Sequence, residues 1–335
     1  MGTFAIGIQG VLDLNATFIF MEQTSKATAV SSPAKTSKLK DYKELIKFTL
    51  SLTVVFSSVI SYLLVPGVNF NLKMVLLLTL GGMLVTGSAN AINQITERAT
   101  DAMMKRTANR PVAAGRISVN EGWAFAIIAA ATGIAIMWIF FNWQAALISA
   151  ISLFTYAFIY TPLKKVSAIS VLVGAFPGAF PCLIGWVAGE VSGQPFSWTG
   201  GWILFAIQFI WQFPHFWAIA WVAHKDYDRA GFKLLPGQNE PTKTTALQAI
   251  GYSLLMIPIC ALPLFYGGPV CGNETMGMSG LNAIIIGFAA NIFLIVQCVR
   301  LYKDMDVKAA RRVMFSSYAW LPIILLALLA FKSHC

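Results

Sequence analysis

Residues 73–93 read KMVLLLTLGGMLVTGSANAIN, and this stretch decides the fold class. Between Lys73 and Asn93 it carries no charged side chain, and about 20 apolar residues are enough for a helix to cross a bilayer core. Other stretches of the chain have the same character. The spans that we expect lie near residues 47–65, 73–93, 122–141, 144–161, 168–189, 199–222, 246–267, 279–299 and 314–331. The sequence therefore predicts an all-α, polytopic bundle of nine transmembrane helices.

The composition supports a membrane protein and excludes several other classes. The chain has 335 residues, of which 57% are hydrophobic and 11% are charged, whereas soluble domains carry about 25% charged residues. A net charge of +10 would suggest nucleic acid as a partner of a soluble protein. Here the partner is the lipid bilayer, and we expect no nucleic acid. The five cysteines are odd in number and form no CxxC pair, so neither a disulfide framework nor a zinc site is expected.

The basic residues fall on one side of the predicted membrane. Of the 24 lysines and arginines, 22 lie before the first span or after the second, fourth, sixth and eighth; the exceptions are Lys73 and Lys332. By the positive-inside rule the N-terminus and these loops are cytoplasmic. We expect the plasma membrane, or the mitochondrial inner membrane if the organism is a eukaryote. Residues 1–40 are interpreted as a flexible N-terminal tail and residues 41–335 as the membrane domain.

An acidic cluster follows the second span. Asn93, Glu97 and Asp101 are spaced at i, i+4 and i+8, which places them on one face of a helix. Mg²⁺ prefers carboxylates combined with the phosphates of a substrate to an all-protein cage. The pattern therefore indicates a magnesium site at the end of a membrane span.

Cations follow this cluster at once, and they suit phosphate oxygens. They are Lys105, Arg106 and Arg110. The alternative is a solvated loop in which Glu97 and Asp101 pair locally with Arg98 and Lys105.

A second mixed-charge stretch, HKDYDRAGFKLLP, covers residues 224–236 after the sixth span. Two similar loops separated by four helices suggest a pseudo-repeat around one central cavity. Acidic groups facing each other there could hold Mg²⁺ on either side of one diphosphate. By itself this second loop could equally be a solvated one.

His215 lies within the sixth span, in the segment PHFW. Ionisable side chains at membrane depth are usually functional, and an imidazole can bind iron or pair with a carboxylate. The alternative is a histidine at a helix kink, hydrogen-bonded to a neighbouring carbonyl. In the fifth span, small-residue pairs at 174–178 and 185–189 flank Pro177 and Pro181 and indicate close packing of a bent helix.

These motifs resemble a known family. The run that starts at Asn93, NxxxExxxDxxMxRTxxRP, resembles the first signature of the intramembrane UbiA prenyltransferase superfamily, whose usual pattern is NxxxDxxxD. Glu97 departs from it but keeps a carboxylate. The segments YTPLKK at 160–165, PHFWAIA at 214–220 and DYDRAG at 226–231 resemble those of the heme O synthase family. The DxxxD motif of quinone-type members is absent from the second loop, and Lys233 stands where many relatives have proline.

The resemblance implies transfer of a farnesyl group from farnesyl diphosphate to the 2-vinyl group of heme B, giving heme O and diphosphate. It implies Asp101, Asp226 and Lys105 as catalytic residues. The implied Mg²⁺ ligands are Asn93, Glu97, Asp101 and Asp226. The implied substrate-binding residues are Arg106, Arg110, Lys164, Lys165, Tyr227, Arg229 and His215, the last ligating or orienting the heme. A heme A synthase is a candidate partner.

Two other functions remain open at this point. A prenyltransferase acting on a quinone or another aromatic acceptor would share the first loop, but it would carry DxxxD in the second loop and no histidine at position 215. A transporter would place its ionisable residues at the membrane midplane between repeats. Here the acidic residues cluster at one interface, which favours a reaction at headgroup level.

Overall fold

The computed structural model describes residues 37–190, 196–237, 239–271 and 274–334. The chain divides into two units, Met1–Lys38 and Leu39–Cys335, and the second is described here by itself. Residues 1–36 of the expected N-terminal tail lie outside the described residues.

Nine membrane spans make up the described part of the second unit. The long helices are α3 (Phe48–Leu64), α4 (Leu72–Thr96), α6 (Val119–Phe140), α7 (Trp143–Phe154), α9 (Ser170–Ala188), α10 (Thr199–Val222), α12 (Lys243–Ala261), α13 (Leu281–Asp304) and α14 (Val307–Ala330). Eight spans are long and apolar enough to cross a membrane, and the pair α2 (Lys38–Leu45) and α3, bent by 48°, makes the ninth. The predicted fold class is confirmed, and the chain is a multi-pass membrane protein.

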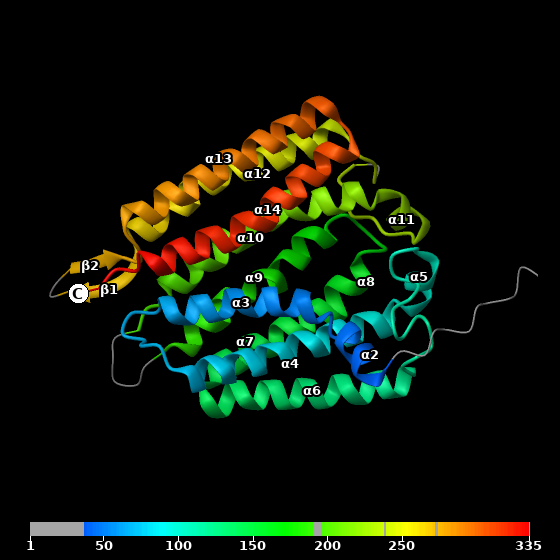
Figure 1. Cartoon of the computed structure of the whole chain (residues 1–335), viewed down its shortest axis with the longest axis horizontal. Coiled ribbons are helices and arrows are strands. Elements are labelled where there is room, and N and C mark those ends of the chain that lie inside the picture. The colour runs from blue at the N-terminus through cyan, green and yellow to red at the C-terminus, as the bar shows by residue number, and fades with distance from the viewer. Residues whose placement is uncertain (1–36, 191–195, 238, 272–273, 335) are drawn as a thin grey trace, which may run out of the picture. The chain divides into compact units, whose positions relative to one another are not determined.

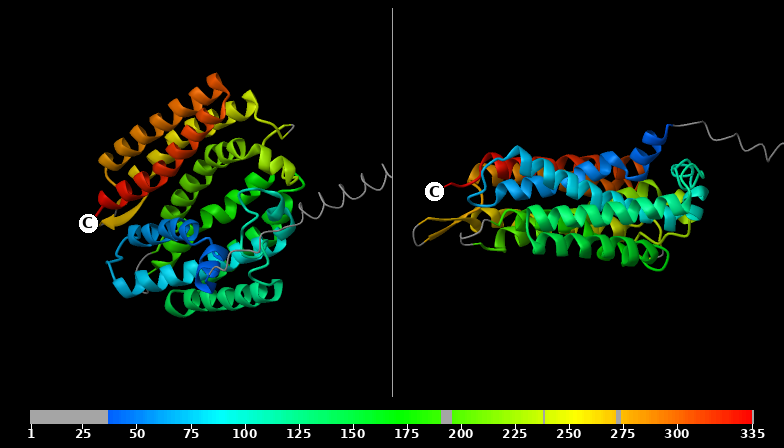
Figure 2. Two further views of the ribbon diagram at one scale, coloured as in Figure 1. Left: turned by 45° about the vertical axis from the view of Figure 1, so that its right-hand side comes forward. Right: turned by 90° about the horizontal axis from the view of Figure 1, so that it is seen from below.

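The spans form one bundle (Figures 1 and 2). Each span packs against the next one along the chain, α3 also packs against α9 and α10 against α14, and a seam forms where α14 lies against α3. At this seam the Lys332 ammonium donates to the carbonyl oxygens of Leu63 (2.8 Å) and Val65 (2.7 Å). Its partial burial lowers the pKa of the Lys332 ammonium. The C-terminal residues thus hold the last span to the first.

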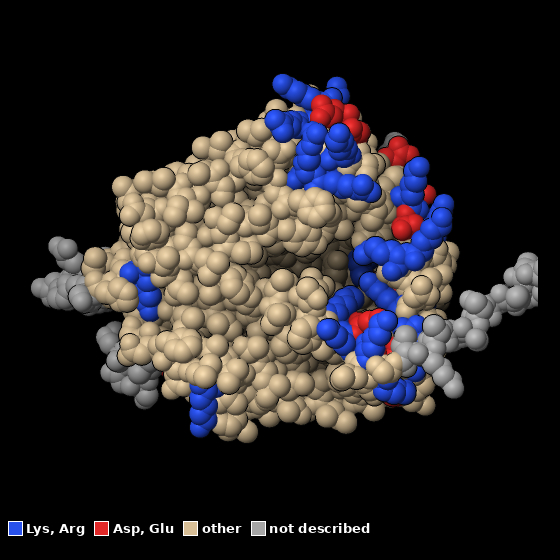
Figure 3. Space-filling model, in the orientation of Figure 1, with Lys and Arg blue, Asp and Glu red and all other residues tan. Residues whose placement is uncertain are grey.

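The outer and end surfaces of the bundle differ in chemistry. Ile127, Ile128 and Trp138 on α6 are 63%, 66% and 65% exposed, as expected for side chains that face lipid. Lysines and arginines gather at one end of the bundle, near α5 (Arg98–Met103), α11 (His224–Arg229) and the connection between α13 and α14 (Figure 3). The same face is hollowed in its middle, next to this basic end.

One connection differs from the prediction. The seventh span was expected to reach residue 267, but α12 ends at Ala261 and is followed by a short 3₁₀ turn, η2 (Leu262–Leu264). Pro263 lacks a backbone N–H and so cannot continue the helix. A hairpin of β1 (Gly267–Cys271) and β2 (Glu274–Gly277), paired antiparallel, occupies the rest of the connection.

The small residues of α9 allow close contact with neighbouring helices. A Cβ atom at Gly185 would overlap the backbone carbonyl of Ser58 on α3, and one at Gly174 would come within 2.6 Å of the Tyr160 ring. Because a backbone atom cannot move aside as a side chain can, Gly185 determines how closely α3 and α9 approach. The structure confirms the close packing that the spacing of the α9 glycines indicated.

Replacing Gly185 by alanine is therefore expected to destabilise the bundle by about 1–3 kcal/mol, as overpacking does in well-packed cores. The measurement is the melting temperature of the purified protein in detergent. The matched control is Gly251→Ala on α12, where an added Cβ meets nothing within 4 Å; there alanine should be neutral or slightly stabilising. Equal shifts in the two variants would contradict the packing argument.

Candidate active site

Three oxygen-bearing side chains meet where α4 passes into α5. Helix α4 ends at Thr96, and Glu97 joins it to α5. The helical spacing continues across the joint, because Glu97 N donates to Asn93 O (2.9 Å) and Asp101 N donates to Glu97 O (2.7 Å). Asn93, Glu97 and Asp101 are 2%, 4% and 0% exposed, and the Asn93 amide donates to Glu97 Oε2 (2.9 Å). The predicted common face is therefore present, and it is buried. We name these three residues the oxygen cluster.

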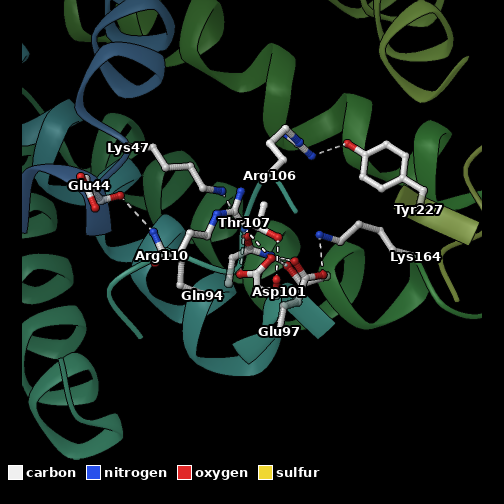
Figure 4. Close-up of polar contacts among 12 residues, drawn as sticks. Glu44, Lys47, Gln94, Glu97, Asp101, Arg106, Thr107, Arg110, Lys164 and Tyr227 are labelled. Carbon is white, nitrogen blue, oxygen red and sulfur yellow. Dashed lines mark hydrogen bonds and ion pairs between the residues drawn. The ribbon is translucent and has the colours of Figure 1, made fainter. Parts of the chain in front are cut away.

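Each carboxylate of the oxygen cluster faces a cation from elsewhere in the chain (Figure 4). Arg110 Nη1 donates to both oxygens of Asp101, at 2.7 and 2.8 Å. Lys164 Nζ lies 2.6 Å from Glu97 Oε1. The alternative of local pairing with Arg98 and Lys105 is wrong.

The partners differ from that alternative because the local cations point elsewhere. Arg98 Nη1 donates to the carbonyl of Ile95 (3.1 Å), and Lys105 is exposed. Both carboxylates are buried, and an exposed side chain cannot neutralise them. The buried carboxylates pair instead with the less exposed cations Arg110 and Lys164.

Lys47 also belongs to the site. From the sequence it was expected only as one of the N-terminal cations. Its Nζ donates to Asn93 Oδ1 at 3.1 Å. Lys47 adopts a left-handed conformation (φ 47°, ψ 57°) between α2 and α3, which breaks the helix. Gln94 Nε2 donates to the carbonyls of Glu44 and Leu45, both at 3.0 Å, at this break. The only signal in the sequence is a lone cation at the first position of an apolar run.

Lys164 is held in an aromatic environment. Its Nζ lies 5.0 Å from the centre of the Tyr160 ring and 5.3 Å from that of Phe232. Burial lowers the pKa of the Lys164 ammonium, and the Glu97 carboxylate acts in the opposite direction. The Lys164 carbonyl accepts a hydrogen bond from Lys233 N (2.7 Å). The segment after α11 thus rests directly on a residue that contacts the oxygen cluster.

A π-helix, η1 (Thr155–Tyr160), leads into Lys164 through the short α8 (Thr161–Leu163). Pro162 cannot donate a hydrogen bond to the preceding turn, which favours this widened geometry, and π-bulges are frequent at functional sites. The rings of Tyr156 and Tyr160 lie 5.3 Å apart, and the Asn93 amide donates to Thr161 Oγ1 (3.4 Å). Neither tyrosine was a predicted site residue, although Tyr160 begins the segment YTPLKK, and no pattern predicted the π-helix.

The two charged connections converge at one end of the bundle. Arg106 Nη2 donates to Tyr227 Oη (3.1 Å), and the guanidinium lies 5.6 Å from the centre of the Tyr227 ring. Met104 packs with Ala230 and Phe232 in a small apolar core. Loops separated by four spans thus lie side by side, as a pseudo-repeat around one cavity predicts.

Several predicted site residues are not drawn into the oxygen cluster. The Asp226 side chain is 26% exposed and lies 4.0 Å from Arg229. Among the described residues we find no hydrogen bond or ion pair between Asp226 and the oxygen cluster. Lys105, Lys165 and Arg229 are exposed. These four side chains are thus fully or partly exposed, unlike the oxygen cluster.

His215 lies deeper, within α10, and is 5% exposed. Its Nδ1 is 2.8 Å from the hydroxyl oxygen of Ser317 on α14. The alternative of a kink histidine bonded to a neighbouring carbonyl is wrong, because the partner comes from another helix.

The chemistry of the oxygen cluster suits a hard divalent cation. Oε1 of Glu97 is buried, and its partner is the Lys164 ammonium 2.6 Å away, which occupies only one of its two lone pairs. This oxygen keeps lone-pair capacity for a cation. No group of three or more His, Cys, Asp or Glu side chains is placed to hold a metal in the part of the chain that the structure describes. Mg²⁺ needs only one or two carboxylates when phosphates and water complete its shell.

Comparison with known proteins identifies relatives over most of the chain. The UbiA prenyltransferase family matches residues 54–321. The protoheme IX farnesyltransferase of Cytophaga hutchinsonii is 43% identical over 298 residues, covering 89% of this chain and 99% of that protein. The protoheme IX farnesyltransferase of Flavobacterium psychrophilum is 40% identical over 297 residues, covering 87% and 94%.

Solved membrane proteins share the fold. A digeranylgeranylglyceryl phosphate synthase superposes with a TM-score of 0.69 at 22% identity, covering 88% of this chain and 98% of that one. A UbiA homologue from Archaeoglobus fulgidus, solved with GPP and Mg²⁺ bound, superposes with a TM-score of 0.57 at 14% identity, covering 86% and 99%. At these identities the likeness concerns the fold alone.

Proposed function

The chain belongs to the UbiA prenyltransferase family, and we propose that it transfers a farnesyl group from farnesyl diphosphate to the 2-vinyl group of heme B. Diphosphate leaves, water adds to the cation that forms on the former vinyl group with loss of a proton, and the product is heme O. The observation that carries the proposal is the buried oxygen cluster, paired with Arg110 and Lys164, at one end of a bundle of membrane spans. The acceptor follows from the relatives that are 40–43% identical over nearly their whole length, which are protoheme IX farnesyltransferases.

The diphosphate end of the site contains the groups that a leaving diphosphate needs. Arg110 and Lys164 already lie against the carboxylates, and a bound diphosphate would share these cations. Arg106 of the first loop donates to Tyr227 of the facing loop, which links the two loops beside this end. The exposed Lys105, Lys165 and Arg229 would reach phosphate oxygens from the water side, with Lys105 counted among the catalytic groups.

A divalent metal fits this end of the site, and we propose that it is Mg²⁺. Its ligands would be Asn93, Glu97 and Asp101 from the oxygen cluster and Asp226 from the facing loop. When bound, the metal supplies positive charge that stabilises the leaving diphosphate. Asp226 is partly exposed and weakly paired, so little holds it away from a ligand.

Both substrates are largely apolar, and the hollowed face of the bundle (Figure 3) would hold them. An allylic cation must be kept from water until the acceptor attacks, and a site within the bilayer achieves this. Aromatic faces stabilise a nearby cation. The Tyr156 and Tyr160 rings contact each other, the Tyr160 ring contacts Lys164, and Thr161 next to it accepts a hydrogen bond from Asn93 of the oxygen cluster. His215 would contact the heme deeper in the hollow.

We place the protein in the plasma membrane, or in the mitochondrial inner membrane of a eukaryote, with the N-terminus and the active-site loops cytoplasmic. The basic end of the bundle (Figure 3) supports this orientation through the positive-inside rule. Residues 41–335 would carry the activity, with 1–40 as a tail. Because heme O is the product, a heme A synthase is the partner that would receive it.

Mass spectrometry of hemes tests the function directly. Membranes that contain the chain, supplied with heme B, farnesyl diphosphate and Mg²⁺, are expected to form heme O, and membranes without it are not. EDTA should stop product formation, and added Mg²⁺ should restore it, because the leaving group then regains its counter-charge. Farnesylation of a supplied quinone with heme B unchanged would overturn the acceptor assignment. Product formation that EDTA does not affect would overturn the metal.

A further inference from the structure

The His215 imidazole is held on three sides. Its ring stacks on Trp211 at 4.8 Å and 17°, and Tyr318 packs edge-on against it at 4.5 Å and 81°. Ser317 Oγ lies 2.8 Å from its Nδ1, and Trp211 Nε1 donates to the Ser317 carbonyl (2.9 Å). Residues of α10 and α14 thus fix both the plane and the rotation of the ring.

The direction of the bond between His215 and Ser317 follows from counting protons. Ser317 Oγ lies 2.7 Å from the carbonyl oxygen of Met314, and a carbonyl can only accept. A hydroxyl has one proton, so the serine donates it to Met314. The serine oxygen must therefore accept from His215, which places the imidazole proton on Nδ1. The lone pair of the neutral ring is then on Nε2, for which we find no hydrogen-bond partner among the described residues.

We propose that Ser317 is a positioning residue that holds His215 in the tautomer whose Nε2 ligates the heme iron. This inference rests on the proposed function, because it takes heme B as the acceptor. Histidines that bind a metal almost always donate their other ring N–H to an oxygen, which orients the ring and raises its basicity. Ser317 supplies that oxygen here.

The position of His215 suits a porphyrin whose edge must reach the diphosphate end. His215 precedes the end of α10 at Val222 by seven residues, or about 10 Å along a helix. Asp226 and Tyr227, which border the diphosphate end, follow directly after the end of α10, in α11 (His224–Arg229). A porphyrin held through its iron keeps its vinyl-bearing edge at a fixed distance from the leaving group, as near-attack positioning requires.

Two porphyrins that differ only in iron separate a ligand-positioning role from a structural one. The purified protein in detergent is titrated with ferric heme B and with iron-free protoporphyrin IX, following absorbance and the quenching of tryptophan fluorescence. The variants are His215→Ala, Ser317→Ala, Ser317→Thr and Ser316→Ala. Ser316 is the matched control, because it lies on the same helix and donates to the Arg312 carbonyl (2.6 Å).

We expect wild type to bind heme B more tightly than protoporphyrin IX, and His215→Ala to remove that difference. Ser317→Ala should weaken heme B binding about tenfold, the low end of what loss of a group that orients a metal ligand does, and shift the heme absorption band. It should leave protoporphyrin IX binding unchanged. Ser317→Thr, which keeps the hydroxyl, should restore both affinity and spectrum, and Ser316→Ala should resemble wild type.

Equal weakening of both porphyrins by Ser317→Ala, or no change in either, would overturn the positioning role. A heme spectrum that is the same in wild type and His215→Ala would overturn iron ligation. If wild type binds neither porphyrin, the proposed function itself fails, and this outcome is distinct from the other two. Melting temperatures of the same samples identify any variant that does not fold.

Discussion

Asp101→Asn is expected to lower the rate of heme O formation by about 10²–10³-fold, the size of effect seen when one preorganised electrostatic group is removed from an active site. Asparagine keeps the shape of the side chain but removes its charge, and with it a ligand for the metal. Asp101 is 0% exposed and holds Arg110 through both oxygens. The substitution therefore also releases the cation that should contact the diphosphate.

Loss of stability must be separated from loss of chemistry in this variant. Removing one partner of a buried ion pair destabilises a protein by about 3–5 kcal/mol. The double variant Asp101→Asn/Arg110→Gln removes both charges, and it should recover much of that stability while turnover stays low. Turnover is measured per mole of folded protein.

The matched control for Asp101 is Asp304→Asn. Asp304 pairs with Arg312 at 3.8 Å, and its side chain is 47% exposed. Exposed pairs of this kind contribute about 0–1 kcal/mol, so neither stability nor turnover should change. Near-normal heme O formation in the Asp101 variant, or recovery of turnover in the double variant, would remove Asp101 from the chemistry.

Asp226→Asn is expected to reduce turnover about 10²-fold with almost no change in stability. Asp226 is partly exposed, and its ion pair with Arg229 is long at 4.0 Å, so the fold loses little when the charge is removed. The same variant should need a higher Mg²⁺ concentration for half-maximal rate, because the metal loses a ligand from the facing loop. The measurement is the rate of heme O formation as a function of added Mg²⁺.

Asp228→Asn is the control for Asp226. Asp228 belongs to the same short helix, α11, two residues further on, and is exposed. Both substitutions remove one negative charge from the same loop, so a general electrostatic effect would act on both. If the two variants show the same rate and the same dependence on Mg²⁺, the metal assignment of Asp226 is wrong.

The parts of the fold that could be predicted depend on local sequence. The nine spans follow from the length of the apolar stretches. The common face of Asn93, Glu97 and Asp101 follows from helical spacing, because the i to i+4 hydrogen bonds continue across Glu97, between α4 and α5. The closeness of the two charged loops was predicted from their symmetry along the chain. The structure brings them together through Arg106 and Tyr227.

The parts that could not be predicted depend on contacts between distant segments. Lys47 reaches Asn93 only because α2 and α3 meet at a break that Gln94 stabilises, and no local pattern specifies that break. The pairing of Glu97 with Lys164 joins segments 67 residues apart. The π-helix replaces regular helical geometry just before Pro162, where a window of hydropathy shows only an apolar run.

The seam at Lys332 has a consequence for how the protein is made. The Leu63 carbonyl that Lys332 satisfies belongs to a residue synthesised 269 positions earlier. The first span is therefore synthesised long before its final neighbour, α14, and one of its flanks lacks that neighbour until Lys332 has been made. A chain that stops before Lys332 would still insert all nine spans, but the hydrogen bonds from Lys332 to the Leu63 and Val65 carbonyls would be missing. Synthesis of Lys332, rather than insertion of any single helix, supplies the contact that joins the last span to the first.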